Sequence, residues 1–253
     1  MTESVFSIAG KRILLTGGGS GIGGALLSAC LKEGALVVAT YRVASQNFDY
    51  LQNNFRITFF PMLCDLSDPA AVAALPSQAT QILGGGIDVL IHSAWVVPEI
   101  APYSLKNLRM TASIGLEAAY ILYGVVAPEM AVRKKGSIIS IVSINGLRAF
   151  PENPAYTSIK GALQMLTKAV ARDFGEKGVR ANNLCPGYVR TRMTAASYAD
   201  PVRYEERRSR TMLGRWAEPE DMVGPCLFLA SDASAYVTGI DLIVDGGWTA
   251  KGM

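Results

Sequence analysis

Short apolar runs recur along the whole chain, and the segments between them carry apolar residues at helical spacing. Seven of these runs predict strands, at residues 12–16, 36–40, 57–63, 88–94, 137–142, 179–184 and 240–244. After the first run, Ile22, Ala25, Leu26 and Ala29 follow a helical period. Strands that alternate with helices predict an α/β fold, in which one doubly wound parallel sheet has helices on both faces. No linker or internal repeat divides residues 1–253, so we expect a single domain.

The first predicted strand runs directly into a glycine-rich loop, TGGGSGIG, at residues 16–23. A strand, a glycine loop and a helix in this order are typical of a dinucleotide site. Glycines let the backbone approach a pyrophosphate, and the N-terminus of the following helix offers free amides to its negative charge. The alternative is a tight strand-to-helix turn that binds no ligand.

A second candidate site combines Tyr156 and Lys160 with Ser143, which follows the apolar run 138–142. The i, i+4 spacing places tyrosine and lysine on one helix face. A phenol has a reference pKa of about 10, and a nearby ammonium favours its phenolate form and lowers that value. A serine hydroxyl can hold a carbonyl or alcohol oxygen beside it. The Tyr–Lys pair alone is a weak signal, and its weight comes from the serine and the glycine loop.

Several of these residues lie at the ends of predicted strands. Gly17, His92, Ser143 and Cys185 all fall there. Ligands of doubly wound sheets bind beyond the carboxyl ends of the strands, so we expect the glycine loop and the serine to converge on one cleft. His92 is the single histidine of the chain. We expect it to satisfy local hydrogen bonds rather than to catalyse.

Together these motifs resemble the short-chain dehydrogenase/reductase family over nearly the whole chain. The resemblance includes Thr16-Gly17-x-x-x-Gly21-Ile22-Gly23, Asp65, Ser143 with Gly146, Tyr156 with Lys160, Pro186-Gly187 with Thr191, and the terminal ASDASAYVTG and VDGG segments. It implies a Rossmann-like fold and an oxidoreductase that interconverts a carbonyl and an alcohol by hydride transfer. The 3-oxoacyl-[acyl-carrier-protein] reductases and the sugar or polyol dehydrogenases are both similar, and the sequence leaves this choice open.

The resemblance also implies roles for individual residues. Tyr156 would exchange a proton with the substrate oxygen, Lys160 would lower the phenol pKa and bind the nicotinamide ribose, and Ser143 would orient the carbonyl. The implied cofactor-binding set is Thr16, Gly17, Ser20, Gly21, Ile22, Gly23, Arg42, Asp65, Ala94, Tyr156, Lys160, Pro186, Gly187, Val189 and Thr191. In this set Asp65 would contact the adenine, and Val189 and Thr191 the nicotinamide carboxamide.

The end of the second strand predicts the preferred cofactor. An acidic residue there would accept hydrogen bonds from the ribose 2′-hydroxyl of NAD. This chain has Tyr41 and Arg42 instead. An arginine favours the additional phosphate of NADP, so we expect NADP, with NAD as the open alternative.

Two departures from the family pattern lie close to the chemistry. His92-Ser93-Ala94-Trp95 replaces the usual Asn-Asn-Ala-Gly, so we expect Trp95 to crowd the cofactor. Gly115 stands where the family usually has an asparagine that holds a water beside the lysine. We expect water or substrate to fill the vacated space. These departures favour an alternative function, a dinucleotide-binding sensor or assembly partner with weak or lost catalysis.

The segment 190–215 is expected to be a mobile lid, and it is rich in arginine. It contains seven arginines and three acids, Asp200, Glu205 and Glu206, an excess of four positive charges. Guanidinium groups match carboxylates and phosphates, which predicts an anionic substrate: a sugar acid, a sugar phosphate or a 3-oxoacyl thioester. The candidate substrate residues are Arg148, Arg190 and Arg192. The alternative is that these arginines lie on a solvated face or pair with the nearby glutamates.

Composition and charge exclude other classes of protein. The net charge of +3 and the lack of basic runs argue against nucleic-acid binding. No membrane span is expected, because Glu117 and Pro128 interrupt the most apolar helix. The chain start lacks a signal-like apolar segment, and the cysteines form no Cys-x-x-Cys pair, so we expect buried thiols, no metal site and a cytoplasmic location. Apolar helices and Trp248 indicate subunit interfaces, and the resemblance implies a homotetramer.

Overall fold

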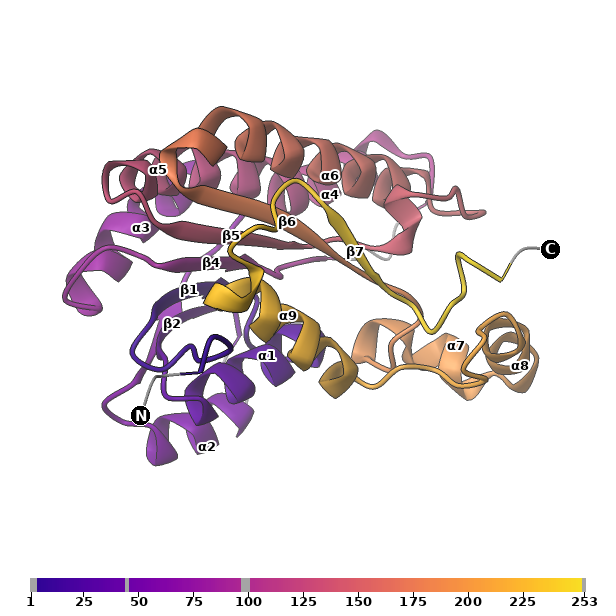
Figure 1. Cartoon of the computed structure of the whole chain (residues 1–253). Helices are drawn as coiled ribbons and strands as arrows, with labels where there is room; N and C mark the ends of the chain where they lie inside the picture. The colour runs from indigo at the N-terminus through magenta and orange to yellow at the C-terminus, as the bar shows by residue number, and fades with distance from the viewer. Residues whose placement is uncertain (1–3, 44–45, 97–100, 252–253) are drawn as a thin grey trace.

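The computed structural model describes residues 4–43, 46–96 and 101–251. Its seven strands form one parallel sheet in the order β3-β2-β1-β4-β5-β6-β7 (Figure 1). The strands are β1 (Arg12–Thr16), β2 (Leu36–Tyr41), β3 (Phe59–Leu63), β4 (Val89–His92), β5 (Gly136–Ile141), β6 (Val179–Pro186) and β7 (Asp241–Val244). The predicted doubly wound α/β fold is confirmed, and the observed strand bounds lie close to the predicted ones.

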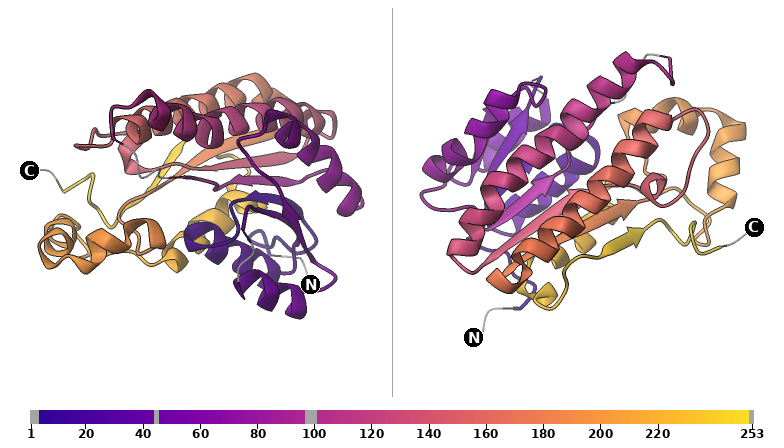
Figure 2. Two further views of the ribbon diagram at one scale, coloured as in Figure 1. Left: turned by 180° about the vertical axis from the view of Figure 1, so that it is seen from behind. Right: turned by 90° about the horizontal axis from the view of Figure 1, so that it is seen from above.

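Helices cover both faces of the sheet (Figure 2). One face carries α3 (Pro69–Ile82), α5 (Ala118–Val132) and α6 (Pro154–Phe174), and the other carries α1 (Gly21–Lys32), α2 (Gln46–Asn54) and α9 (Val223–Ala230). Successive strand residues point to opposite faces. Thus Leu14 and Ile138 belong to the first core, whereas Ile13 and Ile139 belong to the second. Strands buried on both sides explain the continuous apolar runs in the sequence.

One long helical run crosses the first face. It consists of α4 (Leu105–Ala112), a π-helical turn (Ser113–Glu117) and α5. The prediction that Glu117 and Pro128 interrupt this helix is wrong, because the run passes through both. Leu105–Val132 is long and apolar enough to cross a membrane by length and composition alone. Its buried residues pack on α3 and the sheet, as the core helix of a globular protein does.

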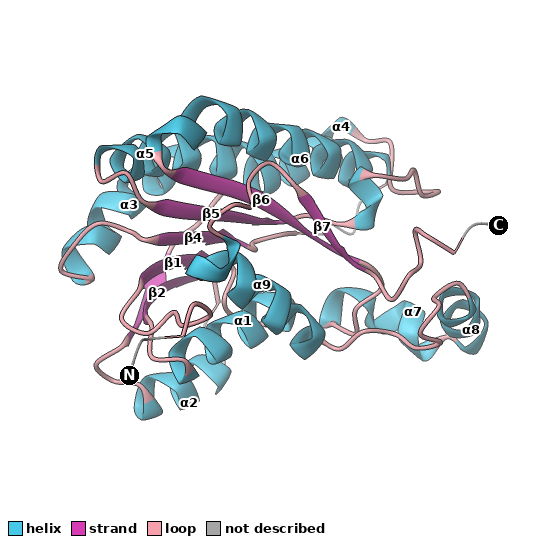
Figure 3. Ribbon diagram, in the orientation of Figure 1, coloured by secondary structure: helices cyan, strands magenta, loops and turns pink. Residues whose placement is uncertain are grey.

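The carboxyl ends of the central strands meet at one edge of the sheet. In register, Thr16 of β1 lies beside His92 of β4, and His92 lies beside Ser140 of β5. The glycine loop, the Trp95 segment and Ser143 therefore leave the sheet side by side. The short helices α7 (Ala195–Ala199) and α8 (Pro201–Ser209) lie beyond the same edge (Figure 3).

Two helical segments differ from expectation. The polar helix α2 was not predicted, because most of its residues are polar; its buried residues Phe48 and Leu51 anchor it to the core. The last helix does not start as an α-helix at Pro219; a 3-10 turn at Pro219–Met222 precedes a short α9. Pro225 lacks the backbone N–H that a continuous α-helix from residue 219 would need.

Candidate active site

The glycine loop between β1 and α1 forms a cradle in which side chains would not fit. Gly17 has a φ of +78°, and a Cβ there would lie 2.6 Å from the Cα of Ala94. A Cβ at Gly23 would lie 2.1 Å from the carbonyl oxygen of Gly17. At the N-terminus of α1, all of which the structure describes, the Ser20 side chain makes no capping hydrogen bond, and the first turn contains no acidic residue. Its amides are therefore available to an anion such as a phosphate.

The segment after β6 lies against this loop. A Cβ at Gly21 would lie 3.3 Å from the Cγ2 of Thr191, so the two predicted cofactor residues adjoin. Val189 is buried, and its carbonyl accepts a hydrogen bond of 2.6 Å from the Thr194 hydroxyl. Pro186 ends β6, and a Cβ at Gly187 would lie only 2.8 Å from the Cα of Asp245. The structure thus brings Thr191 of this segment to the glycine loop, while Gly187 packs against Asp245.

The end of β2 borders the glycine loop, since the amide of Gly18 donates to the carbonyl of Thr40 at 3.3 Å. Arg42 follows there; it is exposed and has no ion pair with any described residue. Asp65, at the neighbouring strand end, accepts hydrogen bonds from the Ser67 hydroxyl and amide at 2.7 and 2.9 Å. These bonds, with a smaller contribution from Arg42, lower the pKa of Asp65.

Ser143 lies just beyond β5, at the start of a 3-10 turn (Ile144–Gly146). It is buried, and its Oγ accepts a hydrogen bond of 3.1 Å from the amide of Asn145. Hydrogen bonding from Ser143 also lowers the pKa of the Tyr156 phenol, although burial outweighs this effect. The predicted pairing of serine and tyrosine is therefore present.

Tyr156 and Lys160 lie in the first two turns of α6. Lys160 is buried; its Nζ donates to the carbonyl of Ile141 at 2.8 Å and lies 5.7 Å from the centroid of the Tyr156 ring. Burial lowers the pKa of Lys160 to about 7. Burial also raises the pKa of Tyr156, and the hydrogen bond with Ser143 offsets this only in part. The predicted lowering of the phenol pKa is wrong here, because burying a phenolate raises the pKa by more than the hydrogen bond with Ser143 lowers it.

Trp95 fills the space beside Gly115. A Cβ at Gly115 would lie 2.1 Å from the Cζ3 of the Trp95 ring. The prediction that water or substrate occupies this space is therefore wrong. Trp95 also packs edge-to-face on Tyr156, with ring centroids 4.9 Å apart, and its ring lies 3.9 Å from the Nζ of Lys160. The two residues that depart from the family pattern, Trp95 and Gly115, therefore pack against each other.

His92 has the structural role that was predicted for it. It is buried, and its Nδ1 lies 2.9 Å from the Thr16 hydroxyl, which also accepts a hydrogen bond from the amide of Ala94 at 3.4 Å. Burial, and next the charge of Lys160, lower the pKa of His92 to about 3, so the ring is neutral at neutral pH. The Thr16–His92 pair ties β1 to β4 directly beneath the candidate site.

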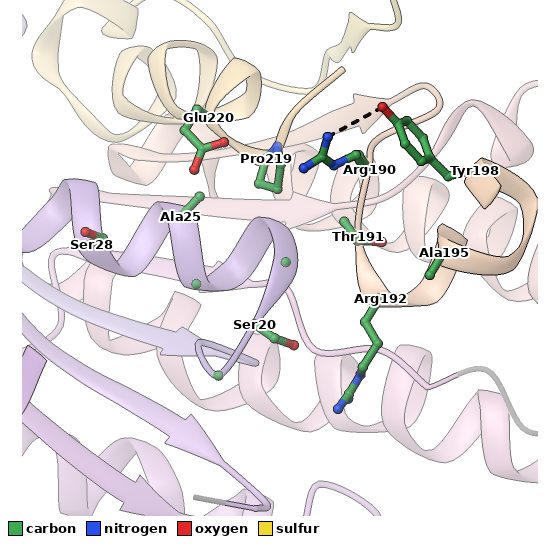
Figure 4. Close-up of a pocket in the computed structure, with 13 residues that line it drawn as sticks. Ser20, Ala25, Ser28, Arg190, Thr191, Arg192, Ala195, Tyr198, Pro219 and Glu220 are labelled. Carbon is green, nitrogen blue, oxygen red and sulfur yellow. Dashed lines mark hydrogen bonds between the residues drawn. The ribbon is translucent and has the colours of Figure 1, made fainter. Parts of the chain in front are cut away.

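A cavity of about 730 Å³ lies between the start of α1 and the segment after β6 (Figure 4). Ser20, Gly21, Arg190, Thr191 and Arg192 are among its lining residues, whereas the Ser-Tyr-Lys set does not line it. Arg190 donates a hydrogen bond of 3.5 Å to the hydroxyl of Tyr198, and the Arg192 side chain extends from the same segment on the side of Ser20 (Figure 4).

Most arginines of the segment 190–215 are neutralised. Five form ion pairs: Arg190 with Glu218, Arg203 with Asp200, Arg208 with Glu205, Arg210 with Glu206, and Arg215 with Asp221. For these the alternative of paired surface arginines is confirmed. Arg192 and Arg207 have no ion pair within the described ranges, and neither has Arg148, which is exposed on the segment after Ser143.

Sequence reasoning missed an aromatic cluster beside this segment. Tyr188, Trp216 and Trp248 come from distant parts of the chain; the centroid of the Tyr188 ring lies 5.4 Å from that of Trp216 and 6.2 Å from that of Trp248. The guanidinium of Arg207 lies 4.8 Å from the Tyr188 ring centroid and 5.7 Å from that of Trp216. The available signal was the position of Tyr188 and Trp216, which flank the arginine-rich segment in the sequence.

The fold and these motifs define a short-chain dehydrogenase/reductase. The family model described as Enoyl-(Acyl carrier protein) reductase matches residues 17–249. The chain belongs to the short-chain dehydrogenase/reductase family and is an NAD(P)-dependent dehydrogenase/reductase. The predicted family and enzyme class are confirmed.

Individual relatives are similar over almost their full lengths. Gluconate 5-dehydrogenase of Gluconobacter oxydans is 35% identical over 252 residues, with 98% of each chain covered. 2-Dehydro-3-deoxy-D-gluconate 5-dehydrogenase of Bacillus subtilis is 32% identical over 253 residues, again with 98% of each chain covered. A crystal structure of a gluconate 5-dehydrogenase from Burkholderia cenocepacia, in complex with NADP and tartrate, matches with a TM-score of 0.89 and 31% identity, and 97% of each chain is covered.

Proposed function

We propose that this enzyme interconverts the alcohol and carbonyl forms of a sugar acid and uses NADP(H) as its cofactor. The observation that carries the proposal is the meeting of Ser143, Tyr156 and Lys160 beside the glycine cradle, at the carboxyl edge of the sheet. The similarity to gluconate and 2-dehydro-3-deoxygluconate dehydrogenases supports the substrate class.

The residues present fit a nicotinamide dinucleotide. The cradle at Gly17 and Gly23 would be closed by any Cβ, which leaves backbone amides to face a pyrophosphate. Arg42, exposed and without an ion pair among the described residues, would bind the 2′-phosphate of NADP. Asp65, Val189 and Thr191 would complete the site around the adenine and the carboxamide. When bound, the cofactor supplies or accepts the hydride.

The remaining chemistry falls to three side chains. Tyr156 would exchange its proton with the substrate oxygen, and its raised pKa keeps the phenol protonated and ready to donate during carbonyl reduction. The hydroxyl of Ser143, which acts on the pKa of the Tyr156 phenol, would hold and polarise that oxygen. Lys160 would place a positive charge behind the phenol and bind the nicotinamide ribose.

An anionic substrate is supported by the few arginines that have no acidic partner among the described residues. Arg207 lies on the ring of Tyr188, and Tyr188 is two residues beyond Pro186. Arg148 follows the turn that starts at Ser143. Arg192 extends into the cavity beside the glycine loop, where a phosphate group of the cofactor is the more suitable partner. A guanidinium over an aromatic ring keeps its hydrogen-bond donors free for a carboxylate.

Turnover measurements test this function. We expect NADP-linked oxidation of D-gluconate to exceed that of the matched neutral polyol D-glucitol by about tenfold or more in kcat/KM. A 3-hydroxyacyl thioester serves as the third substrate, because it is the product expected of the 3-oxoacyl reductase alternative. Turnover of the thioester alone would replace the sugar-acid assignment, and no turnover of any of the three compounds would contradict it.

The proposal extends to assembly and location. We propose a homotetramer, which the exposed apolar side chains on the long helices support, such as Tyr120, Val132 and Met165. All four cysteines are free and buried, which suits the reducing cytoplasm. We propose that residues 1–253 act as one domain and that the segment 190–215 closes over the substrate as a lid.

A further inference from the structure

One side chain that neither motif nor expectation assigned to the chemistry touches both catalytic candidates. The Trp95 ring lies 3.9 Å from the Nζ of Lys160 and meets the Tyr156 ring edge-to-face, at an interplanar angle of 82°. It comes from the end of β4, whereas its two partners lie on α6.

The third partner of Trp95 is Gly115, where a side chain would collide with the indole. A Cβ at Gly115 would meet three atoms of the indole, Cζ3, Cη2 and Cε3, at 2.1, 2.7 and 2.8 Å. Gly115 lies buried inside the π-helical turn, and such turns are frequent at functional sites. The indole is therefore locked between the two helices, and its orientation depends on this glycine.

The indole also lies beside the buried positive charge of Lys160. Lys160 is buried and forms no salt bridge in the part of the chain that the structure describes. Its Nζ has one hydrogen bond, to the carbonyl of Ile141. The electron-rich face of an indole attracts an ammonium most strongly where water is excluded. Trp95 presents this face to the Nζ of Lys160 at 3.9 Å, closer than the Tyr156 ring at 5.7 Å, and so helps to compensate the charge.

We propose that Trp95 is a positioning residue, which holds Lys160 in its charged form beside Tyr156 and requires glycine at position 115 to do so. The proposal rests on the proposed function, because the roles of Tyr156 and Lys160 belong to it. Trp95 itself exchanges no proton.

Three variants test this role. Trp95→Leu keeps an apolar bulk but removes the aromatic face, so the neutral amine of Lys160 becomes favoured and its pKa falls. We expect the alkaline limb of the kcat profile to move down by about one pH unit. Trp95→Phe keeps an aromatic face and should move it less. Gly115→Ala should act like Trp95→Leu, because the new methyl displaces the indole.

A matched control lies on the same helical run. Gly124 of α5 is exposed, and a Cβ there meets nothing within 4 Å. Gly124→Ala therefore makes the same chemical change without touching Trp95, and it should leave the pH profile unchanged. The double variant Trp95→Leu with Gly115→Ala should lose no more activity than Trp95→Leu alone, since both changes remove one contact.

The pKa of Lys160, followed by NMR of lysine labelled with ¹³C at Cε, gives a readout that needs no turnover. We expect it to fall in Trp95→Leu and in Gly115→Ala. An unchanged pKa and pH profile in Trp95→Leu overturn the proposal, even if lower thermal stability reduces activity. If wild-type protein turns over none of the three test substrates, the proposed function fails, while the lysine titration still decides the part played by Trp95. Should Gly115→Ala not fold, the comparison of leucine with phenylalanine at position 95 decides.

Discussion

The buried ammonium of Lys160 is expected to lower the free energy of unfolding, and the variant Lys160→Met measures by how much. Methionine has a similar length and no charge, so it removes the buried ammonium while keeping most of the packing. We expect the variant to unfold at a higher denaturant concentration than wild type while losing turnover.

The magnitude follows from the change in pKa. The pKa of Lys160 is lowered from 10.5 to about 7 because burial penalises the charge, a difference equivalent to about 5 kcal/mol. The hydrogen bond to Ile141 and the indole face of Trp95 offset part of this cost. We therefore expect the variant to be about 1–3 kcal/mol more stable below pH 7.

The gain should depend on pH in a defined direction. Between about pH 7 and 10.5 the unfolded chain holds the lysine proton more tightly than the folded protein does, so wild type becomes more stable as pH rises. The advantage of the variant is complete below pH 7 and decreases steadily as the pH rises toward 10.5.

Urea unfolding at about pH 6 and about pH 9 checks both the sign and the trend. Lys106→Met is the control, because it makes the same chemical change at an exposed position on α4 and leaves the burial of Lys160 unchanged. A Lys160→Met protein that is less stable than wild type at pH 6, or whose gain is the same at both pH values, would refute the reasoning.

Three further predictions follow from the proposed function. Tyr156→Phe should abolish turnover and leave cofactor affinity within about twofold, measured by calorimetry, because only the proton donor is removed; substantial residual activity would contradict the assignment. Arg42→Ala should weaken NADP binding by about one to two decades and barely affect NAD, since one charge-assisted contact is lost; equal losses for both cofactors would argue against a 2′-phosphate contact. Arg207→Gln should raise KM for gluconate about tenfold or more and leave the neutral polyol unaffected, with a smaller difference at high salt; a parallel change for both substrates would show a packing role on Tyr188.

The sheet was predictable from sequence because its strands are buried on both faces. A strand buried on both faces has apolar residues at successive positions, so runs such as 137–142 are easy to recognise in the sequence. The glycine loop then fixes where the first strand ends. The chain order of strands then defines the edge where Gly17 and Ser143 meet. Helix α2 was not predicted because most of its residues are polar, although Phe48 and Leu51 pack into the core, and Pro225 limited the last helix.

Charges were harder to predict than apolar patterns. The excess of arginine in the segment 190–215 was correctly counted, yet five of the seven arginines are ion-paired, two of them with acids outside the segment, Glu218 and Asp221. The pKa of Tyr156 likewise depends on burial, which the i, i+4 spacing of tyrosine and lysine does not encode. Both errors arise because electrostatic effects depend on solvent access and on partners brought in by the fold.

The indole–glycine contact shows why the two departures from the family pattern do not indicate lost catalysis. Trp95 and Gly115 lie twenty positions apart in the sequence, and each alone suggests a damaged site. In the fold the bulk gained at one position occupies the space released at the other. The same exchange gives the buried ammonium of Lys160 an aromatic face and leaves Ser143 and Tyr156 in contact. In a site that had lost its function, the space at Gly115 would be expected to stay empty and the charge of Lys160 to stay uncompensated. Here the Trp95 ring fills that space and lies over that charge.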